Sequence, residues 1–92
     1  MDPMKPGEAK KRIRRIIADG TVAFSSHAFD EIAKDEMTTV DCCNVLRGGV
    51  VETPEFERGS WRYRVRTNQM CVVVVFRSPE ELKVITAWRI RS

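Results

Sequence analysis

Residues 61–77 read WRYRVRTNQMCVVVVFR, and this stretch contains two adjoining strands. Apolar side chains first alternate with arginines, which is the period-two pattern of a strand with one apolar face. After a tight turn at 67–69, the unbroken apolar run that begins at Met70 is typical of a central strand covered on both faces. Because the connection is short, the two strands are predicted to pair antiparallel. The apolar members of the first strand are Trp61, Tyr63 and Val65.

Three helices are predicted upstream of this pair. The first runs from Pro6 to Asp19, and Gly20 stops it. Ser25 or Ser26 can N-cap a second helix that runs to about Glu36. Residues 38–41 have capping-box form and open a third helix, which ends at Gly48-Gly49. The side chains expected to face inward are Ala9, Ile13, Ile16 and Ile17, then Ala28, Phe29, Ile32 and Ala33, then Val40, Cys43 and Leu46.

Further strands are predicted before and after the central pair. Residues 22–24 form a short strand, and residues 50–56 form one that Pro54 weakens into an edge or a bulge. Alternation over residues 82–91 places Leu82, Val84, Thr86 and Trp88 together. We therefore expect an α+β fold in which three helices pack on a mainly antiparallel sheet of four to five strands. Residues 1–92 form a single domain, with a basic N-terminal helix at 1–20 and an α+β core at 21–92.

Composition excludes several classes of protein. The chain has 92 residues, of which 42% are hydrophobic and 32% charged, which suits a soluble globular domain. Its longest apolar run, from Met70 to Phe76, is far shorter than the roughly 20 residues that span a bilayer, so we expect no membrane segment. The three cysteines lack zinc-ligand spacing and are expected to be buried free thiols in a bacterial-type cytoplasm. No metal and no cofactor are expected.

Charge is distributed in three blocks along the chain. Residues 1–18 carry six basic and two acidic side chains, net +4. Residues 19–57 carry two basic and nine acidic ones, net −7, and residues 58–92 carry eight basic and two acidic ones, net +6. This asymmetry suggests one surface that faces a polyanion. The alternative is that each block is simply the solvated face of an unrelated element.

Arg62, Arg64 and Arg66, here called the arginine row, share one face of the predicted strand. Three neighbouring guanidinium groups repel one another unless an anion lies over them, and phosphates would suit such a row. The alternative is that these arginines pair across the sheet with Glu52, Glu55 or Glu57. Residues that could extend the basic surface are Arg58, Arg77 and Arg89, together with Lys11, Arg14 and Arg15 of the first helix.

His27, the only histidine of the chain, lies in the first turn of the second helix. The positive end of the helix dipole favours neutral imidazole there, and neutral imidazole can act as a general base. RNA cleavage without a metal needs such a base, cations near the phosphorus, and an acid for the leaving oxygen. Tyr63 is a candidate by chemical type, although it is expected on the other face of its strand. The alternative role of His27 is to hydrogen-bond the neighbouring strand and fix the helix start.

Several of these segments resemble those of a known bacterial family. The sequence Phe24-Ser25-Ser26-His27-Ala28, followed later by residues 49–52, 62–65 and 84–88, resembles a family of small proteins of unknown function with an S-x-H-A motif. That family is often encoded beside a zinc-finger antitoxin of the MqsA (YgiT) type. Its pattern is similar to the MqsR and RelE-like type II toxins, compact α+β proteins that cleave mRNA, many of them on the ribosome. The resemblance covers about residues 22–90.

The resemblance implies site residues at Ser26, His27, Arg62, Tyr63, Arg64, Thr86 and Trp88. It also implies mRNA and a cognate antitoxin of the MqsA (YgiT) type as partners. Members of the family commonly have an arginine four residues after the motif histidine, where this chain has Glu31. That departure leaves open whether the chain is active.

Three functions therefore remain as hypotheses. The first is a toxin-like, metal-independent mRNA endoribonuclease. The second is a non-catalytic RNA- or partner-binding module with the toxin fold. The third is an interaction protein whose basic face binds only an acidic partner.

Vicinal Cys42 and Cys43 point about 100° apart on a helix, so we expect packing rather than a redox role.

Overall fold

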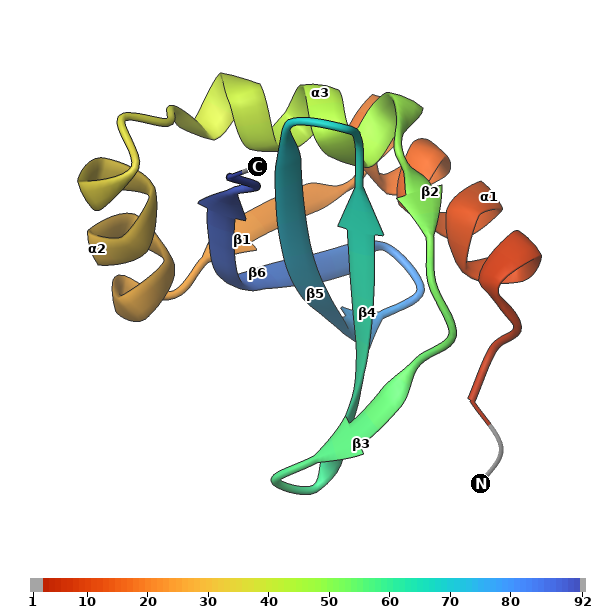
Figure 1. Cartoon of the computed structure of the whole chain (residues 1–92). Coiled ribbons are helices and arrows are strands. Elements are labelled where there is room, and N and C mark those ends of the chain that lie inside the picture. Colours follow the sequence, from red (N-terminus) through yellow and green to blue (C-terminus); the bar gives the residue numbers. More distant parts are fainter. Residues whose placement is uncertain (1–2, 92) are drawn as a thin grey trace.

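The computed structural model describes residues 3–91 and shows an α+β fold with three helices and six strands in this part of the chain (Figure 1). The helices are α1 (Pro6–Asp19), α2 (Ser26–Lys34) and α3 (Thr39–Gly48). The strands are β1 (Thr21–Phe24), β2 (Val50–Val51), β3 (Glu55–Glu57), β4 (Ser60–Arg66), β5 (Met70–Ser78) and β6 (Glu81–Arg89). The predicted bounds of the first helix and the capping box of the third are confirmed.

The main sheet has the strand order β1-β6-β5-β4-β2, and β3 pairs with β4 beyond it. All pairings are antiparallel except that of β1 with β6, which is parallel. The sheet thus has six strands rather than four or five, because the segment predicted at 50–56 forms two separate strands. Proline has no backbone N–H to donate to a ladder, and Pro54 lies in the break between β2 and β3.

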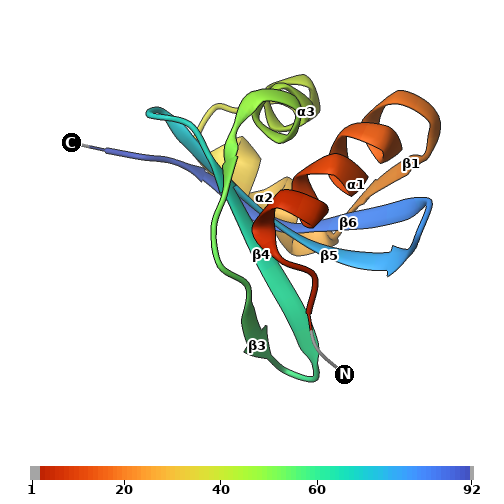
Figure 2. The same cartoon turned by 90° about the vertical axis from the view of Figure 1, so that its right-hand side faces the viewer.

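One hydrophobic core joins the helices to one face of the sheet. Figure 2 shows α1 and α3 lying on the same side of the sheet. Tyr63 and Val65 of β4 point into this core, and so do Ala9, Ile13 and Ile16 of α1. The basic N-terminal helix is therefore part of the same core as the residues that follow it.

Some side chains predicted to face inward do not. In α2 only Ala28 and Ile32 are buried, whereas Phe29 is 50% exposed and Ala33 is also exposed. This helix packs chiefly on one strand, β6, so a narrow stripe of its surface is covered. In α3 the buried residues are Cys42, Val45 and Leu46 instead of Val40, Cys43 and Leu46. The predicted and the observed sets of residues both have helical spacing and share Leu46. Packing against the sheet therefore determines which set is buried.

Helix α2 covers the part of β6 that β1 leaves unpaired. The parallel pairing ends at Phe24↔Val84, and the Ser25 hydroxyl then donates to the Ile85 carbonyl oxygen at 3.1 Å. At the other end of α2, an Asp35 Oδ2 accepts the backbone N–H of Arg89 at 2.8 Å. The Arg89 side chain in turn donates to the carbonyl oxygens of Asp35 and Glu36. These bonds satisfy edge groups of β6 that would otherwise be open.

The three cysteines are free thiols, as predicted. Cys42 and Cys71 are buried, and Cys43 is half-buried. Burial raises the pKa of Cys42 to about 11 and also raises the pKa of Cys71. Both buried thiols therefore stay protonated near neutral pH, and a protonated thiol is a poor nucleophile. Over residues 3–91, no helix has the length and apolar character needed to cross a membrane.

The Asp35 carboxylate should make the stability of the fold depend on pH. Its hydrogen bond from the Arg89 backbone, aided by Arg91 at 3.2 Å, holds the pKa of Asp35 below its ordinary value of 3.8. A lowered folded-state pKa stabilises the fold above the unfolded pKa, and that contribution is lost as pH falls through the folded pKa. We expect Asp35→Asn to lower the free energy of unfolding at pH 6 and to matter progressively less below about pH 4. Urea denaturation at pH 6 and pH 3 measures this, and an equal deficit at both values would contradict it.

Candidate functional site

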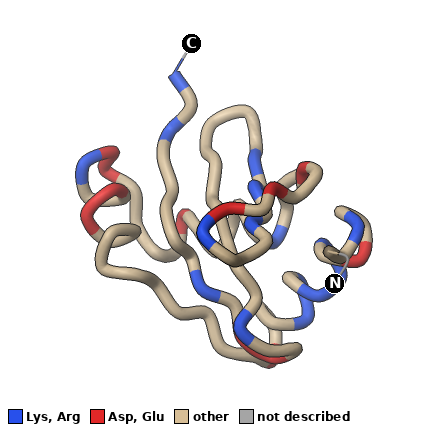
Figure 3. Tube along the Cα trace, turned by 90° about the horizontal axis from the view of Figure 1, so that it is seen from below, with Lys and Arg blue, Asp and Glu red and all other residues tan. Residues whose placement is uncertain are grey.

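The arginine row lies on the sheet face opposite α1 and α3, and a row of glutamates runs beside it. Arg66 Nε lies 2.6 Å from Glu52 Oε2, Arg64 Nη1 lies 3.2 Å from Glu55 Oε1, and Arg62 Nη1 lies 3.7 Å from Glu57 Oε2. Glu52, Glu55 and Glu57 are here called the glutamate row. In Figure 3 the end of the molecule with β3 and β4 is nearest the viewer, and acidic and basic segments lie side by side there. Cross-strand pairing, one of the two readings of the arginine row, is therefore present.

These ion pairs are weak enough for another anion to displace. All six side chains are between 27% and 56% exposed. Exposed pairs of this kind contribute about 0.2–1 kcal/mol each, because water screens them and holding two long side chains costs entropy. In addition, the Nε of Arg62 is buried and has no hydrogen-bond partner among the described residues. The glutamate row thus neutralises the arginines without satisfying every guanidinium donor.

A β-bulge brings Thr86 and Trp88 onto the same face as the arginine row. Val73 pairs with Thr86 and Val74 pairs with Val84, so Ile85 is the extra residue of β6. Across the sheet, Arg64 aligns with Val73 and hence with Thr86, and cross-strand neighbours share a face. Strict alternation predicted that Leu82 and Val84 would share a face with Thr86 and Trp88. That prediction is wrong, because a bulge reverses the side-chain alternation that follows it.

Two adjoining clefts are formed on this face. The first, called the His27 cleft, has a volume of about 480 Å³ and is lined by His27, Glu57, Arg58, Arg62, Ile85 and Thr86. The second, called the Trp88 cleft, has a volume of about 100 Å³ and is lined by Glu55, Glu57, Arg62, Arg64, Val73, Thr86 and Trp88. Arg62, Glu57 and Thr86 belong to both. Most residues that the resemblance picked out therefore meet at one place, although they come from α2, β4 and β6.

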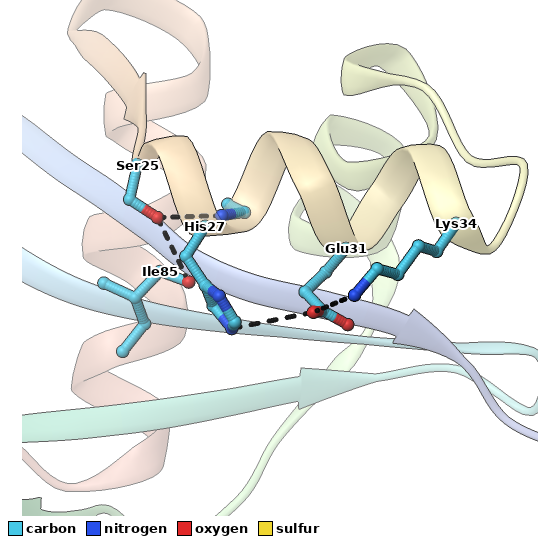
Figure 4. Close-up of polar contacts among 6 residues, drawn as sticks. Ser25, His27, Glu31, Lys34 and Ile85 are labelled. Atoms are coloured by element: carbon cyan, nitrogen blue, oxygen red, sulfur yellow. Dashed lines mark hydrogen bonds and ion pairs between the residues drawn. The ribbon is translucent and has the colours of Figure 1, made fainter.

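His27 reaches its cleft from the first turn of α2 (Figure 4). Its side chain is 67% exposed, and its Nε2 lies 3.9 Å from Glu31 Oε1, which also pairs with Lys34 at 3.4 Å. Among the described residues, His27 makes no hydrogen bond to the neighbouring strand, so the alternative role predicted for it is wrong. Ser25 has that role, because its hydroxyl accepts from the Ala28 N–H at 3.0 Å and donates to Ile85. Figure 4 shows the imidazole free of that bridge and directed along the helix toward Glu31.

Arg58 occupies an unfavourable backbone conformation at the edge of the His27 cleft. Glu57 pairs with Ser60, so Arg58-Gly59 is a two-residue turn, and its φ angles are 50° and 82°. Positive φ at both positions is the type I′ geometry, which favours Asn-Gly over Arg-Gly. A non-glycine residue in the left-handed region costs about 1–2 kcal/mol. Strain of this kind is concentrated at functional sites in proteins, and here it accompanies a guanidinium that lines a cleft.

Other predicted site residues lie elsewhere. Tyr63 is 2% exposed on the core face, and its hydroxyl donates to the Met4 carbonyl oxygen at 2.8 Å. Burial raises the pKa of Tyr63, and the side chain does not reach either cleft. Lys11, Arg14 and Arg15 are on α1, on the far side of the sheet, and Arg15 donates to the Pro79 carbonyl oxygen.

The remaining expected residues are at the margins of the site. Arg89 is held by the α2–α3 connection through its bonds to Asp35 and Glu36, so its guanidinium is engaged in the fold. Arg77 is exposed at the end of β5, and neither cleft includes it. Ser26 is exposed at the first position of α2, while Ser25 is the N-cap.

Comparisons with known proteins identified no relative of this chain. No family model matches the chain, and neither curated proteins nor solved structures gave a match. Within residues 3–91, no group of three or more His, Cys, Asp and Glu side chains is placed to hold a metal ion.

The glutamate row should compete with any anion that binds the arginine row. We expect Glu55→Gln and Glu57→Gln to tighten the binding of inorganic polyphosphate several-fold, because each change leaves one guanidinium unpaired. Fluorescence anisotropy competition at two salt concentrations measures the affinities and the salt slope. Glu80→Gln, in the β5–β6 turn, is the matched control and should have little effect. Equal affinities for all three variants and the parent chain would contradict the competition.

Arg58 should show a trade-off between stability and binding. We expect Arg58→Asn to raise the free energy of unfolding by up to about 1 kcal/mol, because Asn-Gly suits a type I′ turn. The same change should weaken polyphosphate binding, since it removes one cation of the His27 cleft. Urea denaturation and the binding assay test the two effects separately. A variant that loses stability while keeping its affinity would show that Arg58 is retained for folding instead.

Proposed function

We propose that this chain is the toxin of a bacterial type II toxin–antitoxin system, a metal-independent endoribonuclease that cleaves mRNA in the cytoplasm. The observation that carries the proposal is the His27 cleft, where an imidazole from α2 meets two guanidinium groups, those of Arg58 and Arg62. RNA cleavage without a metal requires a proton acceptor, cations near the phosphorus and a proton donor for the leaving oxygen. His27, Arg58 and Arg62 supply the first two, and solvent supplies the third. The resemblance to MqsR and RelE-like toxins supports the same reaction.

The proposed reaction uses each group in one role. His27 takes the proton of a ribose 2′-hydroxyl, and the 2′-oxygen attacks the adjacent phosphorus. Arg58 and Arg62 stabilise the negative charge that develops on the phosphorane oxygens. The bond from phosphorus to the 5′-oxygen then breaks, that oxygen receives a proton from solvent, and a 2′,3′-cyclic phosphate remains.

A second candidate function is a non-catalytic module that binds RNA or an acidic partner. It is favoured by the surroundings of His27, whose exposed ring has only the Glu31 contact at 3.9 Å to orient it among the described residues. General bases act best when a second group fixes the ring. Under this reading the arginine row binds phosphates or the carboxylates of an antitoxin, and the glutamate row is displaced in either case. A zinc-finger antitoxin of the MqsA (YgiT) type is the proposed partner.

Cleavage of an RNA oligonucleotide in excess EDTA distinguishes the two functions. For the toxin, we expect cleavage in EDTA, a cyclic phosphate product, and no cleavage when the reacting 2′-hydroxyl is replaced by hydrogen. His27→Gln should slow cleavage about 100- to 10,000-fold, the usual contribution of a general base. Arg47→Gln, an exposed change on α3, is the matched control.

Two results would overturn the enzymatic proposal. One is cleavage by His27→Gln at the rate of the parent chain, which would remove His27 from the site. The other is RNA that binds with a steep salt slope and stays intact, which would establish the binding module instead.

A further inference from the structure

The two strands β3 and β4 form an arm that extends beyond the main sheet. Residues 55–62, here called the arm, pair with each other from Glu55↔Arg62 to Glu57↔Ser60. Figures 1 and 2 show this arm projecting away from the helices, with β3 at its free edge. Because strand side chains alternate, its two faces differ. One face carries the ion pairs of Glu55 and Glu57, and the other carries Phe56 opposite Trp61.

An aromatic groove lies between this second face and the start of α1. Its volume is about 350 Å³, and its lining includes Met4, Arg12, Trp61, Tyr63, Val75 and Phe76. Phe56 extends the groove along the arm, since its ring is 58% exposed and its centroid lies 5.1 Å from that of Trp61. Single exposed rings are common in proteins, but Phe56 continues a groove that is itself lined by apolar side chains, and contiguous apolar surface of this kind is characteristic of binding sites.

Positive charge accompanies the aromatic rings. The Arg12 guanidinium lies 5.7 Å from the centre of the Phe76 ring and has no ion pair among the described residues. Residues 3–18 carry six cationic side chains and one carboxylate. Figure 3 shows basic segments along α1, apart from the acidic and basic segments of the arm. Flat apolar rings next to an unpaired guanidinium complement a ligand that is both planar and anionic.

We propose that the aromatic groove binds an unpaired base of a single-stranded nucleic acid, stacked against Trp61 and Phe56, with an adjacent phosphate at Arg12. The inference rests on the proposed function, because the same strand would occupy the arginine row on the opposite face. The free edge of β3 lies between the two surfaces, and no described strand pairs with it there to block the path of a nucleic-acid strand. Stacking on aromatic rings tolerates any base, so this groove adds affinity without choosing a sequence.

The two tryptophans of the chain report on the two surfaces separately. Trp88 lies in the Trp88 cleft beside the arginine row, and Trp61 lies in the aromatic groove. In a Trp88→Phe variant, the remaining tryptophan fluorescence, excited at a wavelength that Tyr63 does not absorb, therefore comes from Trp61 alone. The probes are a single-stranded deoxyoligonucleotide, which lacks the 2′-hydroxyl and stays intact, and inorganic polyphosphate, which has charge but no bases.

We expect the deoxyoligonucleotide to quench Trp61 and polyphosphate to leave it unchanged. Phe56→Ala should weaken oligonucleotide binding roughly 5- to 150-fold and leave polyphosphate binding as it was. Phe29→Ala is the matched control, because Phe29 is similarly exposed, at 50%, but lies on α2 stacked against Phe24. Thermal unfolding of both variants checks that each has kept the fold.

Four results overturn the inference. Oligonucleotide bound without any change in Trp61 emission would place the bases elsewhere. Equal effects of Phe56→Ala and Phe29→Ala, or equal loss for both probes, would remove stacking as the cause. Absence of deoxyoligonucleotide binding to a chain that cleaves RNA would overturn the inference and leave the proposed function standing. By contrast, quenching of Trp61 with no cleavage of RNA would leave the groove established and the endoribonuclease disproved.

Discussion

The carbonyl group of Ile85 determines where the candidate site forms. Ile85 is the extra residue of a bulge in β6, and its oxygen accepts the hydroxyl of Ser25, which at the same time caps α2. The bulge turns Thr86 and Trp88 toward the arginine row, and the hydrogen bond fixes the start of the helix that carries His27. A single polar contact therefore aligns the strand and the helix from which the two sides of the His27 cleft come.

The ion pairs between the arginine row and the glutamate row set the net charge of the basic face. The arginine row would carry three unopposed charges if the glutamate row were not beside it, and the self-repulsion would destabilise the sheet. Because the ion pairs are exposed, they offset this repulsion without holding the arginines permanently. The face is therefore nearly neutral when no ligand is bound. It becomes strongly basic when an anionic ligand displaces the carboxylates.

The sequence predicted the features that depend on local chemistry. Period-two alternation placed Tyr63 and Val65 in the core and the arginines outside, and the capping box at Thr38 placed the start of α3. The sequence could not predict the bulge at Ile85, because no glycine or charged residue marks that position. Only the pairing of β6 with β5 shows the bulge. Nor could the sequence choose between two helical stripes in α3, because both have the same spacing and the sheet decides. The Arg58-Gly59 turn did have a signal, a glycine between two β-rich segments, that points to positive φ.

The parallel pairing of β1 with β6 links parts of the chain that are synthesised far apart in time. Ser25 and Ile85 are separated by 60 residues, and the docking of α2 depends on their contact. Contacts of such long sequence separation form late, because the loop between them must close first. Helix α2 therefore has no strand to dock on until β6 has emerged from the ribosome. A nascent chain that contains His27, Arg58 and Arg62 but not β6 would lack the assembled cleft, so the proposed activity would arise only after β6 has been synthesised.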